Sequence, residues 1–291
     1  MDRKIVAALA ALLVLGGCAG GTERSGGQAR LDRRIEPQAL TFDGYARAAG
    51  QVDAQFASAG EVARALQVAA AYEPKSLERG MVAFAAAAAL QDKAFVDGVR
   101  KAERARPGLA RRLAANPQAV LDVPGGRTAA ARASAALARQ AAPVVRAGQA
   151  ATKASYSTQR QAWAKASAPD PRGRLARVKA AGRTPPASSP EALYASAGQG
   201  GRGRGPAGPV AVRGTAVAAL SVLGEAARAR PLLDEARSGQ CLRLAKLNLH
   251  QCLASAGPAY EDIYCLGRHA LSETAQCMET AAKGPIRRAG A

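Results

Sequence analysis

The sequence predicts a mostly α-helical protein, in which a disordered basic linker joins an Ala-rich helical bundle to a smaller, disulfide-stapled helical hairpin domain. Three observations lead to this fold class. The 291 residues are 48% hydrophobic, which is enough to build a core. About a quarter of them are Ala and only 4% are aromatic, a balance that favours helices over β-sheets. Four of the five cysteines lie after residue 240, so the predicted disulfides belong to the end of the chain.

Residues 1–17 are predicted to be an export signal. Arg3 and Lys4 precede an uncharged apolar run from Ile5 to Leu15. A membrane-spanning helix needs roughly 20 apolar residues, so this shorter run is typical of a cleaved signal peptide. We therefore expect the protein to leave the cytosol.

The residues Leu15-Gly16-Gly17-Cys18 resemble the lipobox of bacterial lipoproteins, over the first 20 residues only. The resemblance implies that the chain is cut before Cys18 and that the Cys18 thiol carries a diacylglyceryl lipid, with palmitate-type acyl chains anchoring the protein in a membrane. With Ala19 after the cysteine, it also implies the cell outer membrane, with the folded part facing the periplasm. The alternative is an ordinary signal peptide that is cut elsewhere.

The mature chain is predicted to begin with a flexible tether over residues 18–38, which is rich in Gly, Arg, Gln and Ser. A helical bundle domain follows over residues 39–168, where apolar residues recur at helical spacing between Pro and Gly breakers. We expect helices over residues 58–73, 75–91, 93–106 and 127–167. Asp92 is the predicted N-cap of the third helix, and Pro143 leaves open whether the last is one helix or two. The expected packing residues of that last segment are Leu137, Val144, Tyr156 and Trp163.

Residues 169–214 are predicted to be a Pro/Gly/Arg-rich linker, because the helical period of apolar residues disappears there. The basic residues of this segment could bind anionic envelope polymers, such as phosphorylated glycolipids or cell-wall carboxylates, in a salt-dependent way. The alternative is a solvated spacer, and export argues against nucleic acid as a partner. The anion-binding candidates are Arg172, Arg174, Arg177, Lys179, Arg183, Arg202 and Arg204.

Helical spacing returns over residues 215–284, the predicted Cys-rich helical domain, and residues 285–291 form a tail. Export favours disulfides between its four cysteines. The midpoints of Cys241–Cys277 and of Cys252–Cys265 both fall at the Gly257-Pro258 break, so an antiparallel helix pair folded there would form two nested bridges. Other pairings stay open from the sequence alone.

The two arms of this hairpin differ in helical phase. Cys241 and Cys252 are eleven residues apart, close to three turns of an α-helix, and share a face. Cys265 and Cys277 are twelve residues apart and are out of phase by about 120°. The sequence therefore predicts that Gly267 loosens the second arm or that its helix starts after Cys265.

A metal or redox site is the alternative use of this segment. His250 and His269, the only histidines, lie beside Cys252 and Cys265, and zinc binds such side chains. The ligands lack the close pairs that are typical of zinc sites, and oxidation competes with thiolate coordination outside the cytosol. We therefore expect no metal or other cofactor.

No catalytic motif stands out in the sequence, which has no phosphate loop, GxSxG, HExxH or SxxK. The favoured interpretation is a non-enzymatic, lipid-anchored envelope protein with a structural, assembly or binding role, whose partners are the membrane and anionic envelope polymers or envelope proteins. An envelope enzyme or accessory subunit that acts on cell wall or glycolipid is the second interpretation. The metal or redox module is the third.

Overall fold

The computed structural model describes residues 29–167, 170–201, 203 and 205–283, and within this part the chain forms a helical bundle without a β-strand. The first half contains α1 (Glu36–Gly50), α2 (Ala59–Ala69), α3 (Pro74–Ala89), α4 (Lys93–Ala105), α5 (Leu109–Ala115), the 3₁₀-helix η1 (Pro117–Asp122) and α6 (Gly126–Thr158). The second half contains α7 (Ala162–Lys165), α8 (Pro171–Ala181), α9 (Pro190–Gly198), α10 (Pro209–Val222), α11 (Ala226–Ala229), the 3₁₀-helix η2 (Arg230–Leu233), α12 (Ala236–Ser255), α13 (Ala259–Cys265), the π-helix η3 (Leu266–Glu273) and α14 (Thr274–Lys283). The predicted helical bundle is confirmed.

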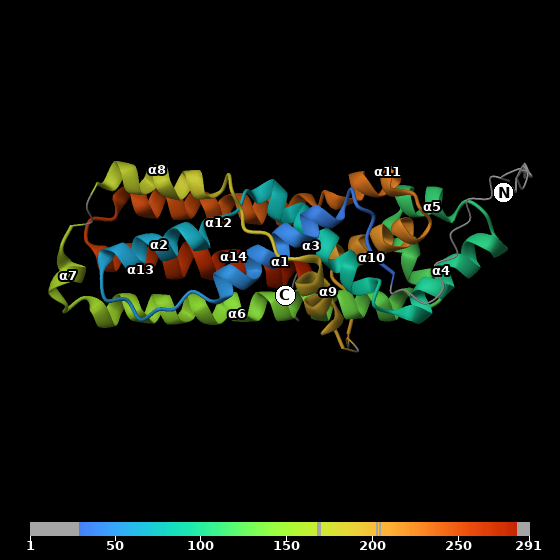
Figure 1. Cartoon of the computed structure of the whole chain (residues 1–291), viewed down its shortest axis with the longest axis horizontal. Helices are drawn as coiled ribbons and strands as arrows, with labels where there is room; N and C mark the ends of the chain where they lie inside the picture. Colours follow the sequence, from blue (N-terminus) through green and yellow to red (C-terminus); the bar gives the residue numbers. More distant parts are fainter. Residues whose placement is uncertain (1–28, 168–169, 202, 204, 284–291) are drawn as a thin grey trace, which may run out of the picture.

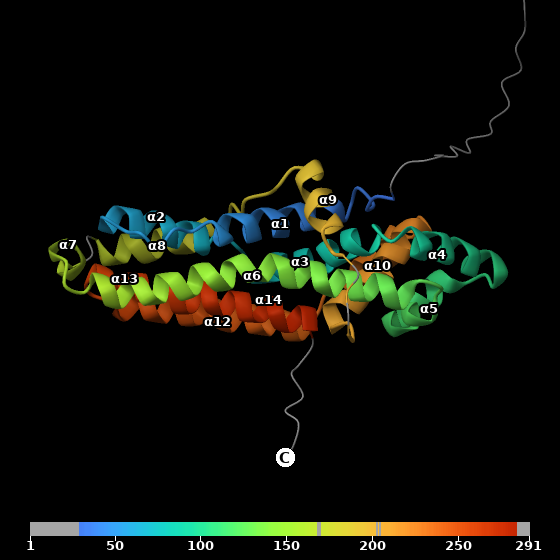
Figure 2. The same ribbon diagram turned by 90° about the horizontal axis from the view of Figure 1, so that it is seen from below.

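The bundle is elongated, and α6 runs along most of its length (Figure 1). The continuous run α13–η3–α14 lies along α6, and α12 packs against this run. Helices α4, α5, α10 and α11 gather at one end of the bundle (Figures 1 and 2). Helix α3 lies in the middle, packed between α1, α6 and α10. The molecule therefore has one central helix with partners on several sides.

The Ala-rich half of α3 explains this central position. Every residue from Ala83 to Ala89 is fully buried. A Cβ placed on Gly214 of α10 would lie 2.5 Å from the Ala85 Cβ, so the two backbones approach as closely as small residues allow. Phe84 packs its ring against Phe42 of α1, with 5.1 Å between the ring centroids.

Two predicted helix starts are confirmed by their caps. The Ser58 side chain accepts a hydrogen bond from the Glu61 amide at the start of α2, and the Asp92 side chain accepts one from the Phe95 amide at the start of α4. Each cap satisfies a backbone donor that the first turn of a helix leaves unpaired.

The segment predicted as helical over 127–167 is mostly one helix, because α6 continues through Pro143. Ala141 and Val144 are fully buried on either side of the proline, and Gly50 at the end of α1 leaves room for its ring. Burial of the flanking residues therefore keeps the helix continuous. Tyr156, expected to be a packing residue, is 62% exposed instead, and its ring lies edge-to-face with the Tyr264 ring, with 6.5 Å between the centroids.

The fold begins earlier than predicted. The predicted tether over residues 18–38 includes residues 29–38, yet Leu31 and Ile35 are buried and α1 starts at Glu36. Leu31 also contacts α9, which lies far from it in the sequence, because the Leu31 amide donates a hydrogen bond to the Tyr194 hydroxyl at 2.9 Å. Charged residues flank Leu31 and Ile35 in the sequence, so the hydropathy pattern does not identify these two as core residues.

The segment 169–214 is also more ordered than predicted, because it contains α8 and α9 and the start of α10. Each of these helices has a proline at its start, namely Pro171, Pro190 and Pro209. Proline is favoured in the first turn of a helix, where its missing N–H costs nothing. The prolines that were interpreted as linker residues therefore begin helices.

Buried side chains fasten this segment to the rest of the bundle. Val178 of α8 and Leu193 of α9 belong to the same hydrophobic cluster as Leu31 near one end of the described chain and Ala282 near the other. One continuous core therefore includes the predicted bundle, the predicted linker and the Cys-rich segment.

The nested disulfide pairing is confirmed. Cys241 of α12 is bonded to Cys277 of α14, and Cys252 of α12 is bonded to Cys265 of α13, with Cα atoms 5.7 Å apart in both bridges. The turn between the arms falls at Gly257 and Pro258, as predicted.

The π-helix η3 brings Cys265 and Cys277 to the same face of the second arm of the hairpin. Its hydrogen bonds run from residue i to i+5, which accommodates an extra residue relative to an α-helix. The twelve-residue step from Cys265 to Cys277 therefore rotates about as far around the helix axis as the eleven-residue step from Cys241 to Cys252. Gly267 lies within η3, so the structure shows the first of the two predicted alternatives. A Cβ on Gly267 would lie 2.4 Å from the Thr152 amide nitrogen, which shows how closely η3 packs on α6.

None of the helices in the described ranges is both long enough and apolar enough to cross a membrane.

Candidate functional site

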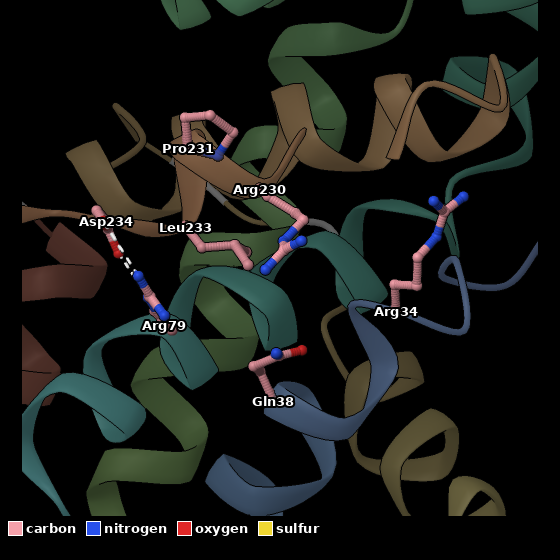
Figure 3. A pocket seen from close by; sticks show the side chains of 7 residues that line it. All are labelled: Arg34, Gln38, Arg79, Arg230, Pro231, Leu233 and Asp234. Carbon is pink, nitrogen blue, oxygen red and sulfur yellow. Dashed lines mark hydrogen bonds and ion pairs between the residues drawn. The ribbon is translucent and has the colours of Figure 1, made fainter. Parts of the chain in front are cut away.

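A pocket of about 430 Å³ lies where the start of α1, the middle of α3 and η2 meet (Figure 3). Arg230 of η2 and Gln38 of α1 reach into it from opposite sides, and Arg79 of α3 forms part of its wall. Leu233 and Pro231 supply the apolar part of the lining. Side chains that are far apart in the sequence thus converge on one space.

Asp234 is the acid of this pocket, and two cations neutralise it. The Arg79 Nε donates to Asp234 Oδ1 at 2.7 Å, and the Lys75 ammonium lies 3.0 Å from the same oxygen. The hydrogen bond from Arg79 is the main reason why the pKa of Asp234 is lowered from its usual value. Asp234 therefore holds Arg79 in place and stays ionised.

Two polar groups in the pocket have no partner among the residues that the structure places. Within the described ranges of the chain, the Arg230 guanidinium makes no hydrogen bond or ion pair. The side-chain oxygen of Gln38, Oε1, is buried and unpaired. Buried polar groups normally have partners, so the Gln38 oxygen is available to a ligand, and the exposed Arg230 guanidinium is accessible to the same ligand.

A second cavity, of about 790 Å³, adjoins the first and shares Arg34 with it. It adds further arginines from the segment before α1 and from α4. The Arg30 guanidinium lies 4.8 Å above the Tyr194 ring, and Arg34 pairs with Asp32 at 3.1 Å. We call the two cavities together the arginine groove, which is lined by Arg30, Arg33, Arg34, Arg79, Arg100 and Arg230.

The groove is strongly positive. Six arginines face three acids, Asp32, Glu36 and Asp234, in the lining of the two cavities. A guanidinium offers five N–H donors in a planar fork that matches phosphate and carboxylate groups. The groove is therefore suited to anionic groups spaced along an extended ligand.

The anion-binding residues predicted from the sequence lie elsewhere, and they separate into different roles. Arg172 is exposed on α8, and the exposed Arg177 pairs with Asp170 at 3.3 Å. Lys179 and Arg183 line another cleft. Arg202 and Arg204 lie outside the described residues, as does Cys18.

Arg174 is a correction, because it is buried and both of its terminal nitrogens, Nη1 and Nη2, already have partners within the protein. Its Nη1 bonds both oxygens of Asp262, and its Nη2 donates to the carbonyls of Leu253 and Ala256 at 2.6 and 3.0 Å. A guanidinium used in this way cannot bind an external anion. It fixes α8 to the end of α12 instead.

The alternative of a metal site in the Cys-rich segment has no free thiolate ligands, because all four cysteines of the segment are in disulfides. His250 and His269 lie on α12 and η3, and His269 Nδ1 is 3.0 Å from Glu273 Oε1. Over the placed residues, no group of three or more His, Cys, Asp or Glu side chains has the geometry of a metal site.

Sequence reasoning missed the arginine groove. Its residues come from the segment before α1 and from α3, α4 and η2, which are far apart in the sequence. The only available signal was the net charge of +19, which gives no position.

Comparison with known proteins gives no relative for this chain. No protein family matches it, and no curated protein and no solved structure matches it.

Proposed function

We propose that this protein is an exported lipoprotein, anchored through Cys18 in the outer membrane and facing the periplasm, and that it binds anionic envelope polymers in a structural or assembly role. The observation that carries the binding role is the arginine groove, with its unpaired Arg230 and its excess of guanidinium groups. The proposed activity is binding, and no reaction is assigned to the protein.

Two features support export. The residues Leu15 to Cys18 have the lipobox pattern. The chain also has two disulfides, Cys241–Cys277 and Cys252–Cys265, and disulfides generally form and persist in oxidising compartments such as the periplasm. Two or more acyl chains on Cys18 would make the attachment stable, since a single chain binds a membrane only marginally.

The groove also explains why a polymer is favoured over a small anion. Arg34 is shared by both cavities, so the line of arginines continues from η2 past the start of α1 to Arg100 on α4. A polymer with repeated phosphates or carboxylates can engage several of them at once. Such binding releases counterions and weakens steeply with salt.

The binding role is tested with immobilised lipopolysaccharide, which carries phosphates, and with peptidoglycan, which carries carboxylates. We expect the double variant Arg34→Gln/Arg230→Gln to lower the slope of log affinity against log salt by about 1 to 2 on one of these polymers. The matched control is Arg111→Gln/Arg112→Gln, which removes the same charge from exposed positions on α5. Equal losses in both double variants, or no binding by the unaltered protein, would refute the role of the groove.

The anchor is tested separately by metabolic labelling with a radioactive fatty acid. The unaltered protein should be labelled and recovered with outer-membrane vesicles, and Cys18→Ala should be unlabelled and released. A Cys18→Ala protein that stays labelled would refute the anchor and leave the binding result intact.

A further inference from the structure

A second cleft, of about 460 Å³, lies between α8, α12 and the connection from α2 to α3. We call it the Lys246 cleft. It does not include any residue of the arginine groove, and its chemistry differs. Its lining includes Lys179 on α8, Arg183 just after α8, Lys246 and His250 on α12, and Tyr72 and Pro185.

Lys246 is a buried ammonium with one hydrogen to spare. Its Nζ donates to the carbonyls of Ala70 and Tyr72 at 2.5 and 2.8 Å and lies 4.3 Å from the centre of the Tyr72 ring. An ammonium has three hydrogens, and two are used by these carbonyls. Burial lowers the pKa of Lys246 to about 8, so the group is still mostly charged near neutral pH. The remaining hydrogen can therefore donate into the cleft.

His250 lies one turn after Lys246 on the same helix. Its Nε2 is buried and has no hydrogen-bond partner in the described part of the chain. Burial, with the nearby Lys246 and Lys179 charges, lowers the pKa of His250 to about 4, so the imidazole is neutral at pH 7. A neutral imidazole without a partner can donate to a ligand or accept from one.

Lys179 and Arg183 complete the cleft from its other side. Both are exposed at the mouth. Gly182 brings them close, because a Cβ there would lie only 2.8 Å from the Tyr72 carbonyl oxygen and 3.2 Å from the Lys246 Nζ. The one acid in the lining, Glu73, already accepts a hydrogen bond from the Ser76 amide at the start of α3. Three cations thus surround the space with one opposing charge.

We propose that the Lys246 cleft binds a phosphomonoester. Its oxygens would accept hydrogen bonds from Lys246, Lys179 and Arg183, as charge-assisted bonds of this kind are the strong ones. With a second pKa near 6, a phosphomonoester is present near neutral pH both with and without a P–OH hydrogen, so it can pair with either tautomer of His250. A carboxylate is ionised at that pH and can only accept. The cavity volume, within the usual range for ligand sites, leaves room for an organic group beside Pro185.

Binding is measured by titration calorimetry at constant ionic strength with glycerol 3-phosphate, and with acetate as the carboxylate control. A second arm uses vesicles with phosphatidate, which carries a phosphomonoester, and matched vesicles with phosphatidylglycerol, which carries only a phosphodiester. Binding of glycerol 3-phosphate assigns a soluble ligand. Binding of phosphatidate vesicles alone, over phosphatidylglycerol vesicles, assigns a lipid headgroup.

The variant Lys179→Ala/Arg183→Ala tests the site without touching a buried residue. We expect it to weaken binding about tenfold or more, because two charged donors are lost. Arg172→Ala/Arg177→Ala removes the same charge from exposed positions of α8 outside the cleft and should change the affinity less than about twofold.

Three results would overturn the proposal. They are no binding in either arm, acetate or phosphatidylglycerol binding as tightly as the phosphomonoester, and equal losses in the two double variants. The arginine groove is intact in all these proteins, so failure here is separate from failure of the proposed function.

Discussion

Arg174 and Asp262 form a buried ion pair that joins two helices 88 positions apart in the sequence. The Arg174 Nη1 lies 2.5 and 2.7 Å from the two carboxylate oxygens, and the side chains are only 4% and 6% exposed. The same guanidinium donates to Leu253 and Ala256, whose carbonyls end α12. One side chain therefore connects α8, the end of α12 and α13.

We expect Arg174→Leu to lower the free energy of unfolding by about 3–5 kcal/mol, because it leaves a buried carboxylate and two carbonyls without their donor. Urea unfolding at pH 7 measures this loss. Arg177→Leu is the control on the same helix, since its pair with Asp170 is exposed and screened by solvent. A similar loss in both variants would show that the buried pair has no special weight.

Removal of the inner disulfide tests how much the staples stabilise the fold. The double variant Cys252→Ala/Cys265→Ala frees a loop that spans 13 positions, and the expected loss is about 3 kcal/mol in the free energy of unfolding. The variant should keep its helical circular dichroism, because Leu249 and Leu253 belong to the common core. Reductant should then destabilise the unaltered protein more than the variant, and an equal effect would contradict the nested pairing.

Two glycine substitutions should act in different ways. Gly267→Ala in η3 places a methyl group 2.4 Å from the Thr152 amide nitrogen, so we expect a loss of about 1–3 kcal/mol from overpacking. Gly198→Ala at the end of α9 meets no atom within 4 Å and should cause no loss. Thermal unfolding of the two variants measures the difference. An unchanged stability of Gly267→Ala would contradict the close packing of η3 on α6 at Thr152.

The pKa of His250 should lie well below that of an unperturbed histidine. Because the chain has two histidines, nuclear magnetic resonance can follow the titration of each one separately. We expect a pKa of about 4 for His250. Because this value lies below the 6.5 of an unperturbed histidine, the unfolded chain takes up the proton first. The contribution of neutral His250 to the free energy of unfolding is complete above pH 6.5 and is lost as the pH falls through about 4. This part of the pH dependence of unfolding should be absent in His250→Gln.

Much of the helical architecture could be predicted from local patterns, and the failures have a common cause. Ser58 and Asp92 mark helix starts because capping is a local interaction. Pro171 and Pro190 were interpreted as breakers, since a proline that ends one helix and a proline that begins another look alike without the partner surface. Burial of Val178 and Leu193 against the core decides between them, and that information is not local.

The sites were harder to predict than the helices. Lys179 and Arg183 were identified by charge, but their neighbour Lys246 was not, because a lysine on α12 looks like any exposed helix residue until Ala70 and Tyr72 are placed beside it. Arg174 shows the converse. Its charge is the same as that of Arg172, and only the position of Asp262 reveals that it is structural.

Because the side chains in the second half of α3 are small, this helix should tolerate substitution by smaller residues better than substitution by larger ones. From Ala85 to Ala89 every side chain is a single methyl group, so a change to glycine removes only that methyl group and some helix propensity. Any enlargement has to push a neighbouring helix outward, as the contact of Gly214 with Ala85 shows. The middle of the molecule thus sets an upper limit on residue size, and variation there is confined to the smallest amino acids.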